Sequence, residues 1–210
     1  MGTFLSMSAT VGASPTQVVQ SLNAFAEQQG GLLEPEALTL DHPDCLVVAP
    51  GKSGASALFP RDFVAWNEAC AHLSSALGQP TFSFHIHDGD LWMYELFEDG
   101  KVVDQFNPIP EYWEGLDPSE VAQWKGDAAA VSKRVPNVSP QQIDKYLVPW
   151  TELMLQNPTP LKAYPADQYP YCVDWQMTDF LNQLGFVFPD EDVPHCERFR
   201  FQIKRKRRRP

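Results

Sequence analysis

The stretch TFSFHIHDGDLWMYELFEDGKVVDQF (Thr81–Phe106) decides the fold class. Its first seven residues alternate between polar and apolar side chains, which is the period of a β-strand. Turn sequences at Asp88–Asp90 and at Asp99–Gly100 separate three strand-like runs, and Asp-Gly is among the strongest short signals for a hairpin. We therefore predict a three-strand antiparallel meander over about residues 81–106.

The segments around the meander alternate between helical and strand-like patterns. A Ser-Pro pair opens a helical pattern over residues 14–31, and a second one covers residues 61–79. After Pro108 the chain predicts short helices, then an amphipathic helix within residues 171–185. The remaining strand-like segments are 3–10, 36–40, 45–50, 55–60 and 198–203. This mixture predicts an α+β fold, an antiparallel sheet with helices packed on it.

Composition places the chain among ordinary globular proteins. It has 210 residues, of which 43% are hydrophobic and 20% charged, so we expect a single domain over residues 1–203. No apolar run reaches the roughly 18 residues of a membrane span, so we expect no membrane segment. The four cysteines have no metal-site spacing, and no signal-peptide pattern opens the chain. These features together predict a cytoplasmic protein.

Charge is distributed unevenly along the chain. All 27 acidic residues lie within residues 1–197, together with only eight cations, which gives this part a net charge of −19. The other eight cations lie between Arg198 and Arg209. A body this acidic repels nucleic acid and attracts basic surfaces. It therefore predicts a protein partner, and a basic surface is the kind that this charge favours.

Two histidines in the meander raise the question of a metal site. His85 and His87 lie on one side of a strand, because side chains repeat every second residue. With Asp90 they could supply the three protein ligands of a catalytic zinc, so a metal-dependent hydrolase is one alternative function. The metallo-hydrolase pattern H-x-H-x-D-H is not completed, because Gly89 and Asp90 occupy its last two positions. The favoured interpretation is the solvent-facing side of a hairpin, with no metal and no cofactor.

Other catalytic patterns are incomplete, which disfavours an enzyme without excluding one. The turn GKSG (residues 51–54) lacks the upstream glycine of a phosphate-binding loop, and no G-x-S-x-G motif is present. The leading hypothesis is a non-enzymatic protein-binding module, such as an acidic immunity-like protein that neutralises a basic partner. Aromatic residues in or after the meander are the candidate binding residues, because exposed Trp and Tyr anchor interfaces. They are Trp92, Tyr94, Tyr112 and Trp113.

The last seven residues, 204–210, form a basic segment that we expect to be disordered. Six consecutive cations could bind phosphate groups, and such binding would weaken steeply with salt. A nucleic-acid-associated protein acting through this segment is the second alternative function. The candidate contact residues are Lys204, Arg205, Lys206, Arg207, Arg208 and Arg209.

Several segments together resemble a group of bacterial cytoplasmic α+β proteins that share an aromatic meander. The likeness rests on MGTFLS at the start, on residues 88–113, on GDAAAV (residues 126–131) and on residues 171–189. The resemblance implies a fold rather than an activity. It also suggests immunity or partner binding as a function, and the basic segment departs from it.

Overall fold

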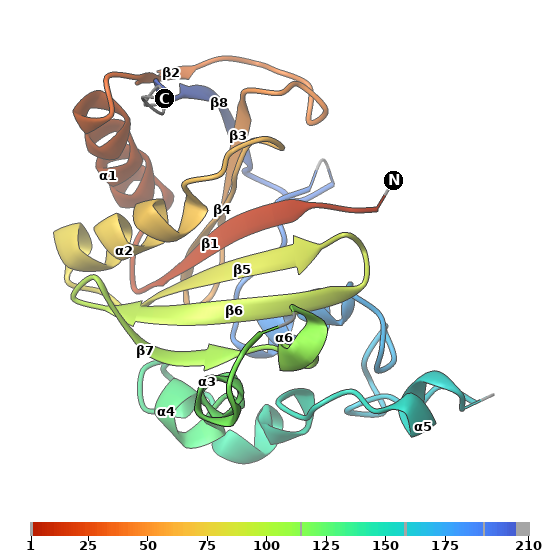
Figure 1. Cartoon of the computed structure of the whole chain (residues 1–210). Coiled ribbons are helices and arrows are strands. Elements are labelled where there is room, and N and C mark those ends of the chain that lie inside the picture. Colours follow the sequence, from red (N-terminus) through yellow and green to blue (C-terminus); the bar gives the residue numbers. More distant parts are fainter. Residues whose placement is uncertain (1, 114, 158, 191, 205–210) are drawn as a thin grey trace.

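The computed structural model describes residues 2–113, 115–157, 159–190 and 192–204. Within these residues, eight strands form one antiparallel sheet in the order β2-β8-β3-β4-β1-β5-β6-β7 (Figure 1). The strands are β1 (Leu5–Val11), β2 (Leu32–Pro35), β3 (Cys45–Pro50), β4 (Gly54–Leu58), β5 (Thr81–His87), β6 (Leu91–Glu98), β7 (Lys101–Phe106) and β8 (Glu197–Gln202). The α+β prediction is confirmed.

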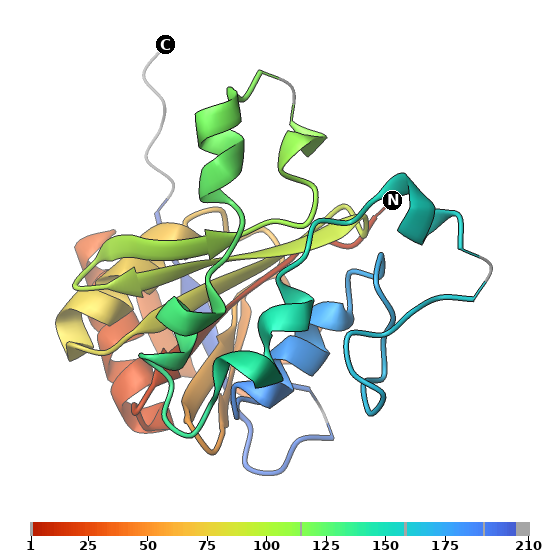
Figure 2. The ribbon, with the colours of Figure 1, turned by 90° about the horizontal axis from the view of Figure 1, so that it is seen from below.

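Helices cover both faces of the sheet (Figures 1 and 2). Helices α1 and α2 pack on one face over the central strands, while α6 and several short helices pack on the other face. The α-helices are α1 (Pro15–Gln28), α2 (Trp66–Leu77), α3 (Pro118–Gln123), α4 (Ala128–Ser132), α5 (Glu152–Leu155) and α6 (Gln176–Gln183). Single 3-10 turns are η1 (Pro110–Tyr112), η2 (Pro140–Gln142) and η3 (Asp144–Tyr146).

The meander forms as the sequence predicts. Strands β5 and β6 pair from Thr81 opposite Phe97 to His87 opposite Leu91, and β7 continues the sheet with a bulge beside Phe97. Both residues of the Asp99–Gly100 turn have positive φ, at 50° and 74°. Such a pair of left-handed residues gives the turn the twist of its strands.

Among the described residues, two large hydrophobic clusters lie on opposite faces of the sheet, and a third, small cluster contains Leu38, Cys45 and Val47. The cluster under α6 is rich in aromatic residues, and the cluster under α1 and α2 is mainly aliphatic with several phenylalanines. Alternation along each strand sends neighbouring side chains to opposite clusters. Phe82, Phe84, Trp92, Tyr94 and Phe106 therefore all point toward α6.

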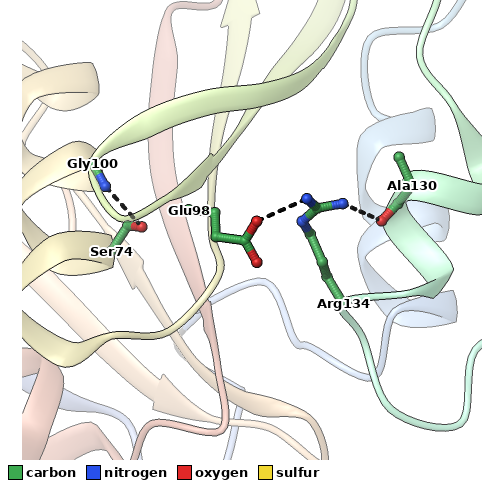
Figure 3. Close-up of polar contacts among 5 residues, drawn as sticks. All are labelled: Ser74, Glu98, Gly100, Ala130 and Arg134. Carbon is green, nitrogen blue, oxygen red and sulfur yellow. Dashed lines mark hydrogen bonds and ion pairs between the residues drawn. The ribbon is translucent and has the colours of Figure 1, made fainter.

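Polar contacts attach the β6–β7 hairpin to both helical layers (Figure 3). On one side, the Gly100 N–H donates to the Ser74 hydroxyl of α2 at 3.3 Å. On the other, the Arg134 guanidinium donates to Glu98 at 2.8 Å and to the Ala130 carbonyl at 3.0 Å. Arg134 thereby connects the segment that follows α4 to the end of β6.

Two predicted boundaries are wrong. Residues 36–40 are not a strand; residues 32–35 form β2 instead, where they pair with β8. The second helix begins at Trp66 rather than at residue 61. Phe63 explains the late start, because its ring packs on Phe59 and Phe201, with centroids 5.0 and 5.1 Å away. Residues 61–65 are thereby held against the sheet as a turn.

In the described part of the chain, no helix combines the length and apolar character needed to cross a membrane.

Candidate binding cleft

The late start of α2 leaves one end of the sheet uncovered. There, residues 61–64 face the chain start at residues 2–4 across a cleft of about 780 Å³. The floor carries Ser6 of β1 and its cross-strand partner His85 of β5. It also carries His87, two residues further along the same face of β5. Trp66, the first residue of α2, closes the inner end. We call this space the cleft.

Apolar side chains at the mouth of the cleft are unusually exposed. Val64 is 69% exposed and Phe4 is 47% exposed, and both line the cleft. Tyr112 and Trp113, each 36% exposed, lie beside it. The His87 ring joins these groups, with its centroid 5.1 Å from those of Phe4 and Trp113 and 5.6 Å from that of Tyr112. The result is an apolar rim of Phe4, Val64, Tyr112 and Trp113 around a polar floor.

His85 lies beneath this rim in a buried position. Its ring stacks on the Trp66 indole, with centroids 4.6 Å apart and planes 4° from parallel. Its Nδ1 lies 2.9 Å from the Ser6 hydroxyl oxygen. Burial, and secondarily the neighbouring His87, lower the pKa of His85 to about 4, so the ring is neutral near pH 7. The expectation of a solvent-facing side is therefore wrong for His85, because α2 covers it.

The Ser6–His85 contact does not extend into a catalytic triad. A serine nucleophile needs a base that a third group orients. The other polar contact of His85 in the described chain is with the Leu5 backbone, not with a carboxylate. Ser6 and His85 are cross-strand partners in the β1–β5 ladder.

The alternative metal site does not assemble. The described residues contain no group of three or more His, Cys, Asp or Glu side chains placed to hold a metal ion. His85 is engaged by Ser6 and Trp66, and Asp90 accepts a hydrogen bond from the Tyr112 hydroxyl at 2.7 Å. His85 and Asp90 therefore contact different groups, His85 with Ser6 and Trp66 and Asp90 with Tyr112.

Carboxylates lie in and beside the cleft. Asp62 lines it, and Asp88 adjoins its edge at Gly2. Asp90 accepts the hydrogen bond from Tyr112 of the rim, and the exposed Glu111 directly precedes Tyr112 in the chain. Among the described lining residues, Arg61 is the one Lys or Arg. The surroundings of the cleft are therefore predominantly acidic.

The four aromatic residues chosen from the sequence separate into two pairs. Trp92 and Tyr94 are 0% and 1% exposed and belong to the core, so their side chains are not available to a partner at the surface. Their polar atoms have internal acceptors, Gln176 for the indole and Asp104 for the phenol. Tyr112 and Trp113 lie at the surface, on the rim.

The basic segment begins at a second surface pocket, which adjoins the cleft. Exposed Lys204 lines a space of about 660 Å³ that shares Asp62, Phe63 and Val64 with the cleft. Arg205, Lys206, Arg207, Arg208 and Arg209 lie outside the described residues. The contact that we predict between these cations and an anion or nucleic acid stays a prediction.

Sequence reasoning missed Phe4, Val64 and Trp66. Residues 61–66 fit a helical pattern, so nothing in their spacing showed that Val64 would lie on an exposed turn. The sequence feature that could have indicated this turn is Phe63, because a second aromatic residue near Phe59 can pack against the sheet before a helix begins.

Comparison of the chain with models of known families, with curated proteins and with solved structures found no match.

Proposed function

We propose that this protein is a non-enzymatic binding module whose cleft docks a basic protein partner. The observation that carries the proposal is the apolar rim of Phe4, Val64, Tyr112 and Trp113 around an open cleft. Aromatic side chains with a polar tip and an apolar body are the common anchors of protein interfaces.

Charge supports a basic partner. Asp62, Asp88, Asp90 and Glu111 adjoin the cleft, within a body that carries a net charge of −19 over residues 1–197. Complementary charge accelerates association and excludes acidic competitors, while the apolar rim supplies affinity after contact. An acidic immunity-like protein that neutralises a basic toxin is one example of this class.

The proposal is tested by capturing proteins from the source cells at low and high salt. The bait is the intact chain, and Val64→Ser is compared with Leu153→Ser, a matched control at another exposed apolar residue, 82% exposed on α5. We expect a basic protein that is retained at low salt, lost at high salt, weakened by Val64→Ser and unaffected by Leu153→Ser. Equal capture by both variants contradicts the proposal.

A version of the chain that ends at Ile203 distinguishes the proposed docking in the cleft from nucleic-acid binding by the basic segment. If nucleic acid or ribosomal material binds the intact chain and not this version, the basic segment carries the function, and docking in the cleft is wrong. If the same basic protein binds both versions, the segment is secondary.

A further inference from the structure

A small hollow lies behind the inner wall of the cleft. It has a volume of about 60 Å³ and shares only Trp66 and His85 with the cleft. Trp66, Trp124 and Glu95 are among the residues that line it. Two aromatic rings and a carboxylate around a space of this size make an environment suited to one cationic group.

Glu95 lacks a cation of its own. In the described chain its side chain forms no ion pair with Lys or Arg, and its hydrogen-bond partner is Asn67. Asn67 also accepts a hydrogen bond from Ser83, at 2.6 Å, on the same face of the sheet. Burial raises the pKa of Glu95, the hydrogen bond from Asn67 opposes this rise, and the Glu68 carboxylate adds to it. A partly buried carboxylate without a counter-ion gains stability when a cation reaches it.

The position of the hollow connects it with the cleft. Because the stacked Trp66 and His85 residues line both spaces, the hollow adjoins the cleft, and a partner that extends across this stack contacts both spaces. Trp124 follows α3 and is held by its backbone, since its carbonyl accepts a hydrogen bond from the Asn107 N–H at 3.0 Å. The second wall of the hollow is thus attached to the end of β7.

We propose that this hollow receives the cationic head of one Arg or Lys side chain of the docked partner, between Trp66 and Trp124 and against Glu95. The inference rests on the proposed function, because the partner that docks in the cleft supplies the side chain. The indole faces attract the positive charge, and Glu95 accepts a charge-assisted hydrogen bond from it. This contact selects a partner with a cation next to its apolar anchor.

The test uses N-acetyl-arginine methylamide as a probe and its citrulline counterpart as the neutral control. Binding to the full chain is followed through the indole N–H resonances in nitrogen-15 NMR spectra. We expect the arginine probe to shift the Trp66 and Trp124 resonances with a dissociation constant on the order of millimolar, and the citrulline probe to leave them unchanged. Resonances that do not move, or that move equally with both probes, overturn the proposal.

Two variants locate the contact. Glu95→Gln removes the charge with little change in shape, and we expect it to weaken the arginine probe about tenfold. Glu34→Gln makes the same change at an exposed residue of β2, the edge strand furthest from β7, and should have no effect. Equal affinities in the two variants contradict a role for Glu95. If Glu95→Gln does not fold, Trp124→Leu replaces it, with the same loss expected.

This experiment needs no partner protein, so its outcome is independent of the capture experiment. Loss of probe binding in Glu95→Gln, with unchanged capture by Val64→Ser, would retain the hollow and reject the cleft as the docking site. The reverse combination would retain the cleft and reject the hollow.

Discussion

The His85 imidazole lies parallel to the Trp66 indole at a centroid distance of 4.6 Å, and this stack separates the cleft from the hollow that contains Glu95. Trp66 begins α2, and His85 lies near the end of β5. The stack therefore fixes where the helical layer ends and the open part of the sheet begins. Any change that moves either ring should alter both spaces.

The burial of His85 predicts a pH-dependent stability. Its pKa falls from an ordinary value of 6.5 to about 4 in the folded chain, so between these values the unfolded chain binds a proton that the folded chain does not. The contribution of His85 to the free energy of unfolding is then fully present above pH 6.5. It declines by about 3 kcal/mol as the pH falls toward 4. Urea unfolding at several pH values measures the decline.

His85→Asn isolates this contribution, because the amide does not titrate and can still form a hydrogen bond with the Ser6 hydroxyl. We expect the variant to lose less stability than the wild type between pH 7 and pH 4. The other ionisable groups are the same in both proteins, so the difference between the two profiles reports on position 85. Identical pH profiles would show that His85 is not buried in its neutral form.

Arg134 should stabilise the meander more than its exposed partner does. Its side chain is 16% exposed, whereas that of Glu98 is 45% exposed, so solvent screens the ion pair itself. We expect Glu98→Gln to lower the free energy of unfolding by less than about 1 kcal/mol. Arg134→Ala also loses the bond to Ala130 and buried packing, and should cost about 1–3 kcal/mol. Thermal unfolding of the two variants tests the order; equal effects would contradict it.

Tyr94 should act on stability and not on partner binding. Its hydroxyl donates to Asp104 at 2.6 Å, so Tyr94→Phe should lower the free energy of unfolding by about 1–2 kcal/mol. Burial raises the pKa of Asp104 and this hydrogen bond lowers it, so the pKa of Asp104 should rise in the variant. Carbon-13 NMR of the carboxyl group measures that rise. Intact stability combined with weakened partner capture would place Tyr94 in the binding surface instead.

Much of the fold followed from local patterns in the sequence. The alternation in Thr81–His87 and the turn at Asp99–Gly100 specify the meander, because each is a strictly local preference. The start of α1 is equally local, since Ser14 and Gln17 form a capping box and Pro15 lies between them in the first turn. These elements lie as predicted.

The cleft depends on contacts that are distant in sequence. Phe63 packs on Phe201, far along the chain, and this contact makes residues 61–65 a turn. The same kind of distant contact determines which aromatic residues are buried. Trp92 and Tyr94 pack on Phe180 of α6, whereas Tyr112 and Trp113 meet His87 at the edge of the sheet. Alternation places Trp92 and Tyr94 on one face of β6, but nothing within residues 81–113 shows that α6 covers this face.

The most direct measurement of the central claim is photo-crosslinking from the cleft in the source cells. A benzophenone amino acid replaces Val64 in one version of the chain and Leu153 in another, both exposed apolar positions. We expect one basic protein to be crosslinked from position 64 and not from position 153, and we expect no adduct when a lysate is irradiated at raised salt instead. An adduct from position 153 alone, or an acidic partner at position 64, would contradict the claim.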